Sequence, residues 1–374
     1  MGLKSDIKYR VGFSLVPGVG RVRLSRLESF FDNLEDAWRA GPAELKRAGL
    51  DDRVAGAVIA ARSRLSLEAE MEKLERHGVK VLSYRDAGYP ARLKEIHDYP
   101  PLLYVRGSIL PEDEWCLAVV GTRRASVYGR QVTEEIVTDL VRSKLTIISG
   151  LARGVDTVAH RSALDAGGRT IAVFGCGLDT VYPGENAFLA RRITERGALV
   201  SEYPLGTGPR AENFPRRNRI MSGLSLGVLV TEAGTSSGAM ITARLALEQN
   251  REVLAIPGSI LSPVSSGTNQ LIQEGAKLVN SYKDVLEELN LTSVVHQMEV
   301  KEIIPASDTE TLLLGQLGFE PTHVDEVCRS SNLSISQVSS TLAMMELKGM
   351  VRQVGTMSYV LAREAREKYM VRVD

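Results

Sequence analysis

Six short apolar runs follow one another between residues 116 and 256, and helical segments separate several of them. Most of these runs are continuously apolar, which is the pattern of strands that are buried on both faces of a parallel sheet. Strands that alternate with helices favour an α/β fold with a doubly wound, Rossmann-like, mostly parallel sheet. The predicted strands are Cys116–Val120, Thr146–Ser149, Thr170–Phe174, Ala198–Ser201, Leu226–Thr231 and Glu252–Ile256.

Glycine, serine and arginine gather where these predicted strands end. Examples are the segments Gly121–Gly129, Ser149–Asp156 and Gly175–Asp179. Ligands of doubly wound sheets bind at the carboxyl ends of the strands. Tight turns explain a glycine at one strand end. The repeated combination of glycine with serine and arginine instead favours a shared anion site.

The combination of glycine, serine and arginine is most concentrated in the stretch Arg210–Gly238. It opens with four arginines against one acid, continues into a buried strand, and ends in the small-residue turn Ala233–Gly238 before an apolar helix. A strand followed by such a turn and a helix points backbone N–H groups beyond the strand end, where they suit phosphate. Arginine adds a flat, permanently charged fork that matches phosphate oxygens. We therefore predict a pocket for a ligand with repeated phosphates.

The composition limits the other classes of function. The 374 residues have a net charge of zero, which excludes a uniformly basic nucleic-acid binder and requires local patches instead. The three cysteines are far apart and without CxxC spacing, so we expect core thiols and no metal site. The absence of a GxGxxG run and of a P-loop lysine predicts no cofactor. We also expect no signal peptide, no membrane segment and a cytoplasmic location.

The chain on either side of the sheet has a different pattern. Residues 1–75 predict an all-α domain of the helix-hairpin-helix or SAM-like kind, with a glycine-containing turn at Pro17–Gly20. The Rossmann-like domain is expected over 76–285, a linker over 286–308 and a winged-helix domain over 309–374. The third helix of the predicted winged-helix domain has no basic residue before Lys348. This favours a protein-contact or packing module over a reader of duplex DNA.

Together, the strand-end motifs resemble one family, DprA (also called Smf), the DNA-processing proteins of bacterial natural transformation. The similarity covers residues of about 80 to 285, and the motifs occur in the family's order. The motifs that carry it are GTRRASVYG, SGLARGVDTVAH, GCGLDTVYPGEN, SEYP, NFPRRNRIMSGLS, VTEAGTSSGAMITA and the ending IPG…GTNQLIQEGA.

The resemblance implies a binding protein and no enzyme. Members of the family bind single-stranded DNA without sequence preference and form homodimers through the Rossmann-like domain. They protect incoming DNA and load the RecA recombinase against single-strand-binding protein. The resemblance therefore implies single-stranded DNA, RecA, single-strand-binding protein and a second copy of the chain as partners, and no catalytic residue.

The predicted DNA contacts come from two sources. The family motifs place one group at the border of the pocket: Arg123, Ser126, Ser149, Gly150, Arg217, Asn218 and Arg219. The strand-end argument adds a second group: Gly121, Arg153, Gly175, Phe214, Arg216, Gly234 and Ser237. Among the aromatic residues, Phe214, Tyr203 and Tyr128 are candidates for stacking on a base.

Two other interpretations remain open from the sequence. Thr231–Thr235 faintly resembles the glycine-rich turn and glutamate of nucleotide phosphoribohydrolases, which have a related Rossmann-like fold. Asp156 and His160, one helical turn apart, could form an acid–base pair, although capping and packing of a helix start explain them better. A winged-helix transcription factor is the third possibility, and it predicts sequence-selective binding to duplex DNA.

Overall fold

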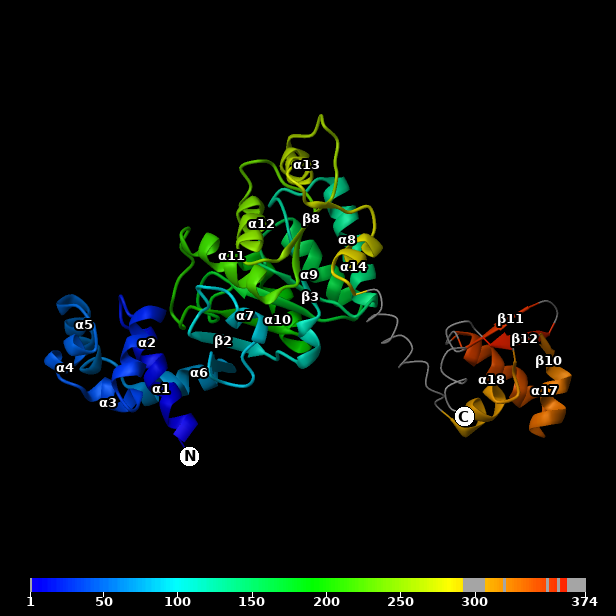
Figure 1. Ribbon diagram of the computed structural model, residues 1–374, viewed down its shortest axis with the longest axis horizontal. Coiled ribbons are helices and arrows are strands. Elements are labelled where there is room, and N and C mark those ends of the chain that lie inside the picture. The colour runs from blue at the N-terminus through cyan, green and yellow to red at the C-terminus, as the bar shows by residue number, and fades with distance from the viewer. Residues whose placement is uncertain (1, 292–306, 319–320, 348–349, 355–356, 362–374) are drawn as a thin grey trace. The chain divides into compact units, whose positions relative to one another are not determined.

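The computed structural model describes residues 2–291, 307–318, 321–347, 350–354 and 357–361 (Figure 1). Contacts within the chain divide it into two compact units, Met1–Leu289 and Asn290–Asp374. The first unit contains both the N-terminal helices and the large sheet, so the boundary expected between residues 75 and 76 stays a prediction. Most of the linker expected over 286–308 lies outside the described residues.

A nine-stranded, mostly parallel sheet forms the centre of the first unit, in the order β1-β2-β6-β5-β4-β3-β7-β8-β9. Strands β6 to β9 in this order run parallel, and β1 and β2 add an antiparallel edge. The predicted doubly wound, mostly parallel sheet is confirmed. Its strands are β1 (Val79–Ser83), β2 (Leu102–Gly107), β3 (Cys116–Val120), β4 (Thr146–Ser149), β5 (Thr170–Phe174), β6 (Ala198–Ser201), β7 (Gly227–Val230), β8 (Glu252–Ala255) and β9 (Lys277–Leu278).

Helices cover both faces of this sheet, which explains why the strands are apolar throughout. Val120 and Ile148 pack with Ile220 of α11 and Ala243 of α12 on one face. Phe174 packs with residues of α9 and α10 on the other face. The helices and 3₁₀ turns of this part are α7 (Ala91–Lys94), η1 (Pro111–Glu114), α8 (Val127–Arg142), α9 (Val155–Asp165), η2 (Gly184–Asn186), α10 (Ala187–Arg196), α11 (Asn213–Leu224), α12 (Gly238–Glu248), η3 (Pro263–Ser265), α13 (Ser266–Gln273) and α14 (Tyr282–Glu288).

The winding of the sheet reverses at β3. Strands β4, β5 and β6 follow one another away from β3 on one side, and after α11 the chain returns to place β7 on the other side of β3. In doubly wound sheets the crevice for a ligand opens at this reversal, beyond the carboxyl ends of the strands. The loops that follow β3, β4 and β7 therefore meet where a ligand site is expected.

The N-terminal part of the first unit is helical, as the sequence predicts. Its core is built around Phe13, Leu27, Trp38 and Leu45, and Asp51 caps α5 by accepting the Val54 amide. Helix α6 packs against β1, and α1 contacts β2. The helices are α1 (Gly2–Ser14), α2 (Arg21–Phe30), α3 (Leu34–Arg39), α4 (Pro42–Arg47), α5 (Asp52–Arg62) and α6 (Leu67–Arg76).

The side chain of Glu28 ties the helices to the sheet. Its carboxylate accepts hydrogen bonds from Arg10 and also from Tyr84 and Arg85, which follow β1. Only 4% of this side chain is exposed. Ion pairs shielded in this way hold their geometry firmly, because breaking one leaves a buried charge.

Within its described residues, the second unit has three helices and a three-stranded sheet in the order β10-β12-β11. Val327, Leu342 and Met345 form part of its core. This arrangement confirms the predicted winged helix. Its elements are α16 (Asp308–Leu314), β10 (Thr322–His323), α17 (Val324–Ser331), α18 (Ile335–Leu347), β11 (Val351–Gln353) and β12 (Ser358–Leu361).

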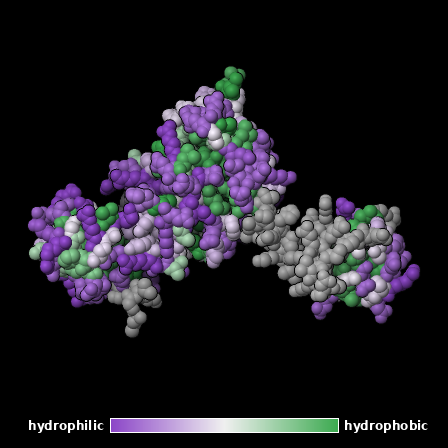
Figure 2. Space-filling view, viewed as in Figure 1, coloured by the Kyte–Doolittle hydropathy of each residue, from purple (hydrophilic) through white to green (hydrophobic). Residues whose placement is uncertain are grey.

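The surface of the first unit is largely hydrophilic, but a hydrophobic tip stands out at the top of Figure 2. The loop between β8 and η3 carries Ile260 and Leu261, which are 92% and 87% exposed. Core packing does not explain two such side chains. Within the described ranges, every helix is too short or too polar to cross a lipid bilayer.

Candidate nucleic-acid interface

A cavity of about 670 Å³ lies at the carboxyl ends of β3 and β7. We call it the strand-end cavity. Its walls come from the loop after β3, from the turn after β7 and from helix α11. Seven of the residues predicted to contact DNA line this cavity: Gly121, Arg123, Phe214, Arg217, Asn218, Gly234 and Ser237.

Arg217 is the most unusual of these residues because it carries a buried charge. It is 4% exposed, its Nε has no hydrogen-bond partner, and its Nη1 donates to the sulfur of Met221 over 3.0 Å. A thioether is a weak acceptor, so both Nε and Nη1 can gain from a stronger acceptor. Burial lowers the pKa of Arg217 to about 10, although the charge of Asp156 acts in the opposite direction. An anion in the cavity would supply the missing acceptors.

Gly150, at the end of β4, makes room for Arg217. A Cβ at residue 150 would lie 1.7 Å from Nη1 of Arg217. The Gly150 and Ala152 amides donate to the carboxylate of Asp156 over 3.1 and 3.2 Å. Contact of Gly150 with DNA therefore stays a prediction, and the structure gives this glycine a steric role.

Arg123 and two adjacent aromatic rings, tilted by 37° to each other, lie beside the cavity. The guanidinium of Arg123 lies 6.0 Å from the centre of the Phe214 ring, and the rings of Phe214 and Tyr182 are 5.4 Å apart. Gly175 lies against Phe214, since a Cβ there would be 3.0 Å from the ring. Rings arranged in this way can stack on bases of any sequence. Tyr182 was not among the predicted contacts, although it belongs to the motif after β5.

The turn after β7 borders the cavity with backbone and small side chains. Ser237 caps α12, its hydroxyl accepting the Ala239 amide over 3.3 Å. Asn218 of α11 reaches across to the Gly238 carbonyl at 3.5 Å. The start of α12 thus faces the same space as Arg217. Its partial positive charge adds to that of the guanidinium.

Two predicted serines are engaged within the protein. The Ser126 amide and hydroxyl donate to the carboxylate of Glu232 over 2.8 and 2.6 Å, and the same hydroxyl caps α8. The Ser149 hydroxyl donates to the Val119 carbonyl and is fully buried. Contact of either serine with DNA stays a prediction, and it would require each to exchange its present partner.

The remaining predicted arginines have other surroundings. Arg153 forms a two-fold ion pair with Glu185, both bonds at 2.9 Å. Arg219 donates to both oxygens of Glu202 over 2.6 and 2.7 Å and pairs with Asp98. Arg216 is exposed on α11, about 100° around the helix from Arg217. The arginine stretch therefore does not act as one cluster: Arg217 lines the strand-end cavity, whereas Arg216 and Arg219 line a second space, described below.

The pair Asp156 and His160 has the environment of a packed helix start. Both are buried, and the Thr170 hydroxyl lies 2.7 Å from Nδ1 of His160. Burial, with the nearby charge of Arg217, lowers the pKa of His160 to about 3. Burial raises the pKa of the Asp156 carboxyl, against the effect of Arg217. A neutral, inaccessible histidine is poorly placed to transfer protons to a substrate.

Known proteins resemble this chain in sequence and in fold. The family model described as DNA recombination-mediator protein A matches residues 80–290. The chain belongs to this family. A model of the DprA winged helix domain matches residues 301–355. Protein Smf of Synechocystis is 35% identical over 392 residues, covering 95% of this chain and 98% of the relative.

Two solved DprA structures resemble the described fold. DNA processing protein A from Streptococcus pneumoniae aligns with a TM-score of 0.66 and 37% identity over 75% of this chain and 97% of the other. DNA processing protein A from Helicobacter pylori aligns with a TM-score of 0.52 and 30% identity over 57% of this chain and 95% of the other. The work on the Helicobacter pylori DprA concerns its single-stranded DNA binding mode.

Proposed function

We propose that this DprA-family chain binds single-stranded DNA without sequence preference at the strand-end cavity. The observation that carries the proposal is Arg217, a buried guanidinium with an unsatisfied Nε at the wall of an open cavity. Phosphate oxygens are strong acceptors for such a group. The single-stranded DNA binding mode reported for the Helicobacter pylori relative supports the same class of ligand.

The contacts available at this cavity suit the backbone of a flexible strand. Arg217 and Arg123 would pair with phosphates, and Phe214 with Tyr182 would stack on a base. Phosphate contacts and stacking carry no sequence information, so affinity should be similar for all sequences. Duplex DNA keeps its bases paired and cannot offer them to the two rings.

Titration of a labelled oligonucleotide by fluorescence anisotropy at several salt concentrations tests this proposal. If about four phosphates are neutralised, log K should fall against log salt with a slope of roughly −3. Arg217→Met should weaken binding about tenfold and reduce the slope by about 0.7. Arg142→Ala, at an exposed site at the end of α8, is the matched control and should behave as wild type.

Two outcomes would contradict the proposal. An affinity that does not change with salt concentration would show that binding does not depend on phosphate contacts. Equal affinity for single-stranded and duplex DNA of the same length, measured in a gel shift, would remove the stacking. If Arg217→Met weakened only certain sequences, readout of the bases would replace binding to the backbone.

The cellular role proposed for this binding is protection of incoming DNA and loading of RecA during natural transformation. Such a protein holds the strand while RecA replaces single-strand-binding protein. The ATPase of RecA on DNA that is coated with single-strand-binding protein is the measurement. Wild-type chain should shorten the lag and Arg217→Met should not. No effect of the wild-type chain would reject the loading role.

The proposed homodimer has a separate test. The apolar loop with Ile260 and Leu261 is the most exposed hydrophobic feature of the described sheet region, and exposed apolar patches often serve as interfaces. Sedimentation should give a dimer for wild type and a monomer for the double variant Ile260→Asp/Leu261→Asp. A dimer that survives the double substitution would move the interface elsewhere.

The enzymatic alternative is not favoured. The glutamate of the Thr231–Thr235 segment, Glu232, is 2% exposed and holds Ser126 with both oxygens. A general acid or base must reach its substrate. Incubation with nucleoside monophosphates should therefore release no free base. Base release that Glu232→Gln abolishes would restore the alternative.

A further inference from the structure

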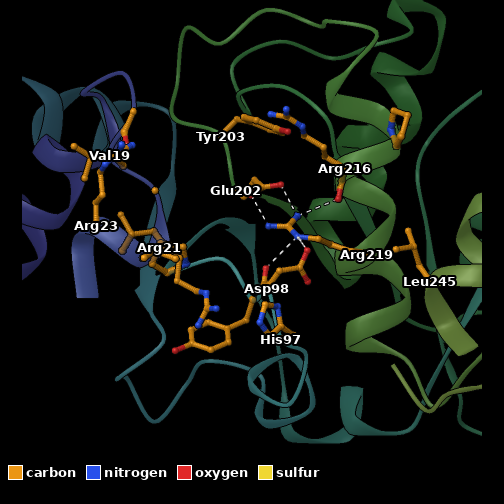
Figure 3. A pocket seen from close by; sticks show the side chains of 18 of the residues that line it. Val19, Arg21, Arg23, His97, Asp98, Glu202, Tyr203, Arg216, Arg219 and Leu245 are labelled. Carbon is orange, nitrogen blue, oxygen red and sulfur yellow. Dashed lines mark hydrogen bonds and ion pairs between the residues drawn. The ribbon is translucent and has the colours of Figure 1, made fainter. Parts of the chain in front are cut away.

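A second space, which we call the hairpin cleft, lies between the N-terminal helices and α11. Its volume is about 990 Å³ (Figure 3). One wall comes from the turn Gly18–Gly20 and the start of α2, and the opposite wall from α11 and α12. The floor includes the segment from His97 to Tyr99. Glu28 of α2 ties the helices of the first wall to Tyr84 and Arg85, which follow β1.

Positive charge dominates the lining of this cleft. Five arginines line it, against the two carboxylates Asp98 and Glu202. Arg219 forms ion pairs with both carboxylates (Figure 3). The five arginines are Arg21, Arg23, Arg26, Arg216 and Arg219.

The side chains of two of these arginines, one on each wall, have neither an ion pair nor a hydrogen bond to the protein within the described residues. Arg23 pairs with Asp51, and Arg26 donates to the Gly49 carbonyl. By contrast, Arg21 and Arg216 form no ion pair within the described residues. Arg21 lies 4.9 Å from the centre of the Tyr99 ring, and Arg216 extends toward Tyr203 (Figure 3). Each wall thus presents one unpaired guanidinium beside an aromatic ring, which is a combination that suits single-stranded nucleic acid.

The hairpin cleft adjoins the strand-end cavity. Pro215 and Ile241 line both spaces. Arg216 and Arg217 are consecutive on α11, and each side chain lines a different space. A strand whose phosphate is held by Arg217 can therefore continue past Pro215 and meet Arg216 next.

Gly20 leaves the backbone of the turn open toward a ligand. Gly18 has a φ of +88°, so its backbone conformation requires glycine. Gly20 has an extended conformation that any residue adopts, and an added Cβ would have no atom within 4 Å. The packing of the protein therefore does not explain the missing side chain at residue 20. Gly20 is the N-cap of α2, a position that favours glycine, and its lack of a side chain also leaves room for the close approach of another backbone.

We propose that the hairpin cleft is the second part of the path of single-stranded DNA, and that it holds the sugar–phosphate backbone along the side of α11 that carries Arg216. This inference rests on the proposed function at the strand-end cavity and adds a second contact region to it. The N-terminal helices then contribute to the length of strand that one chain covers.

Binding of a short and a long oligo-dT to the full chain tests the inference. An oligonucleotide of about six nucleotides fills the strand-end cavity, whereas one of about twenty also reaches the cleft. The double variant Arg21→Ala/Arg216→Ala should bind the short strand within twofold of wild type and the long strand roughly five- to tenfold more weakly. Its salt slope on the long strand should fall by about 1.4, because two phosphate contacts are lost.

Two further variants complete the comparison. Gly20→Ala should reduce affinity for the long strand and lower the melting temperature only slightly, because the added methyl group meets no atom and only the N-cap of α2 is weakened. Arg53→Ala removes an exposed arginine of α5 that does not line the cleft, and it should bind both strands as wild type. Circular dichroism and thermal melting establish that each variant is folded.

The outcomes separate this inference from the proposed function. Unchanged long-strand affinity in a folded Arg21→Ala/Arg216→Ala variant would overturn the cleft inference and leave the strand-end cavity in place. Equal loss on both strands would assign the two arginines to the strand-end site and also overturn it. A loss of affinity confined to duplex DNA would indicate that the cleft binds duplex DNA and not a single strand. Failure of the wild-type chain to bind the short strand would instead reject the proposed function.

Discussion

Gly150 and Arg217 occupy the same corner of the sheet so closely that any side chain at residue 150 would collide with the guanidinium, at 1.7 Å from Nη1. The two residues come from different strand-end segments, the loop after β4 and helix α11. The glycine is therefore required by the arginine. This relationship allows Arg217 to be displaced without being substituted.

Gly150→Ala should displace Arg217 from the cavity wall and weaken binding of single-stranded DNA about tenfold, or ~1.4 kcal/mol. Anisotropy gives the affinity, and thermal melting shows that the variant folds. Gly56→Ala is the matched control, because a Cβ at this helical position meets no atom within 4 Å. Wild-type affinity in a folded Gly150→Ala variant would show that the position of Arg217 is unimportant for binding.

Arg123 and Arg219 should respond in opposite ways to replacement by alanine. Arg123 is exposed and stacked on Phe214, so its loss should reduce affinity for all sequences and leave stability unchanged. Arg219→Ala leaves the carboxylate of Glu202, 19% exposed, without its partner, and it should destabilise the chain by about 3 kcal/mol. Urea unfolding and anisotropy on both variants make the comparison. Unchanged stability and a reduced salt slope in Arg219→Ala would identify Arg219 as a phosphate ligand.

Phe214→Leu should keep the apolar contact over Gly175 and remove the flat ring. The expected loss of affinity is about 1–3 kcal/mol, equal for pyrimidine and mixed sequences. Tyr182→Leu should have a similar effect, because the two rings adjoin at 5.4 Å. Competition binding with oligonucleotides of different sequence measures both. A variant that bound with full affinity would show that its ring does not stack on a base.

The stability of the chain should fall as the pH falls from 6.5 toward 3 because of His160. Its pKa is about 3 in the folded chain, owing to burial, against 6.5 as the ordinary value. The unfolded chain therefore takes up a proton in this range that the folded chain does not, and stability decreases by up to ~1.4 kcal/mol per pH unit. The raised pKa of Asp156 acts in the opposite direction.

Comparing the pH dependence of unfolding in wild type and His160→Asn isolates the histidine. The asparagine keeps a polar group near Thr170 and does not titrate, so the decline below pH 6.5 should be shallower. Identical slopes for the two proteins would mean that another group causes the acid sensitivity. The absolute stability of the variant does not enter this comparison.

The fold could be predicted because strands that are buried on both faces of a sheet consist of continuous apolar runs. Cys116–Val120 is apolar at every position, and the structure covers both faces of β3. The location of the site followed from the rule for strand ends, since residues after β3, β4 and β7 had to meet at one edge. Neither conclusion required knowledge of distant contacts.

The state of each arginine could not be predicted, because it depends on partners far away in the sequence. Arg217 and Arg219 are two residues apart on one helix, which turns them to different sides. Arg219 forms ion pairs with Glu202 and with Asp98, which lies 121 residues earlier in the sequence. Arg217 forms no ion pair within the described residues. Ser126 likewise is engaged by Glu232, 106 residues away. Local patterns give the residue types at a site, and tertiary contacts decide which of them remain available.

Glu232 has a consequence for how the site meets its ligand. Its carboxylate, at the end of β7, holds the amide and hydroxyl of Ser126 in the loop that follows β3, and its carbonyl accepts the Thr122 amide. The two loops are thereby locked into one rigid body before any strand arrives. The loops therefore lose less conformational entropy when a strand binds. More of the free energy of the weak individual contacts with a disordered polymer then contributes to the affinity.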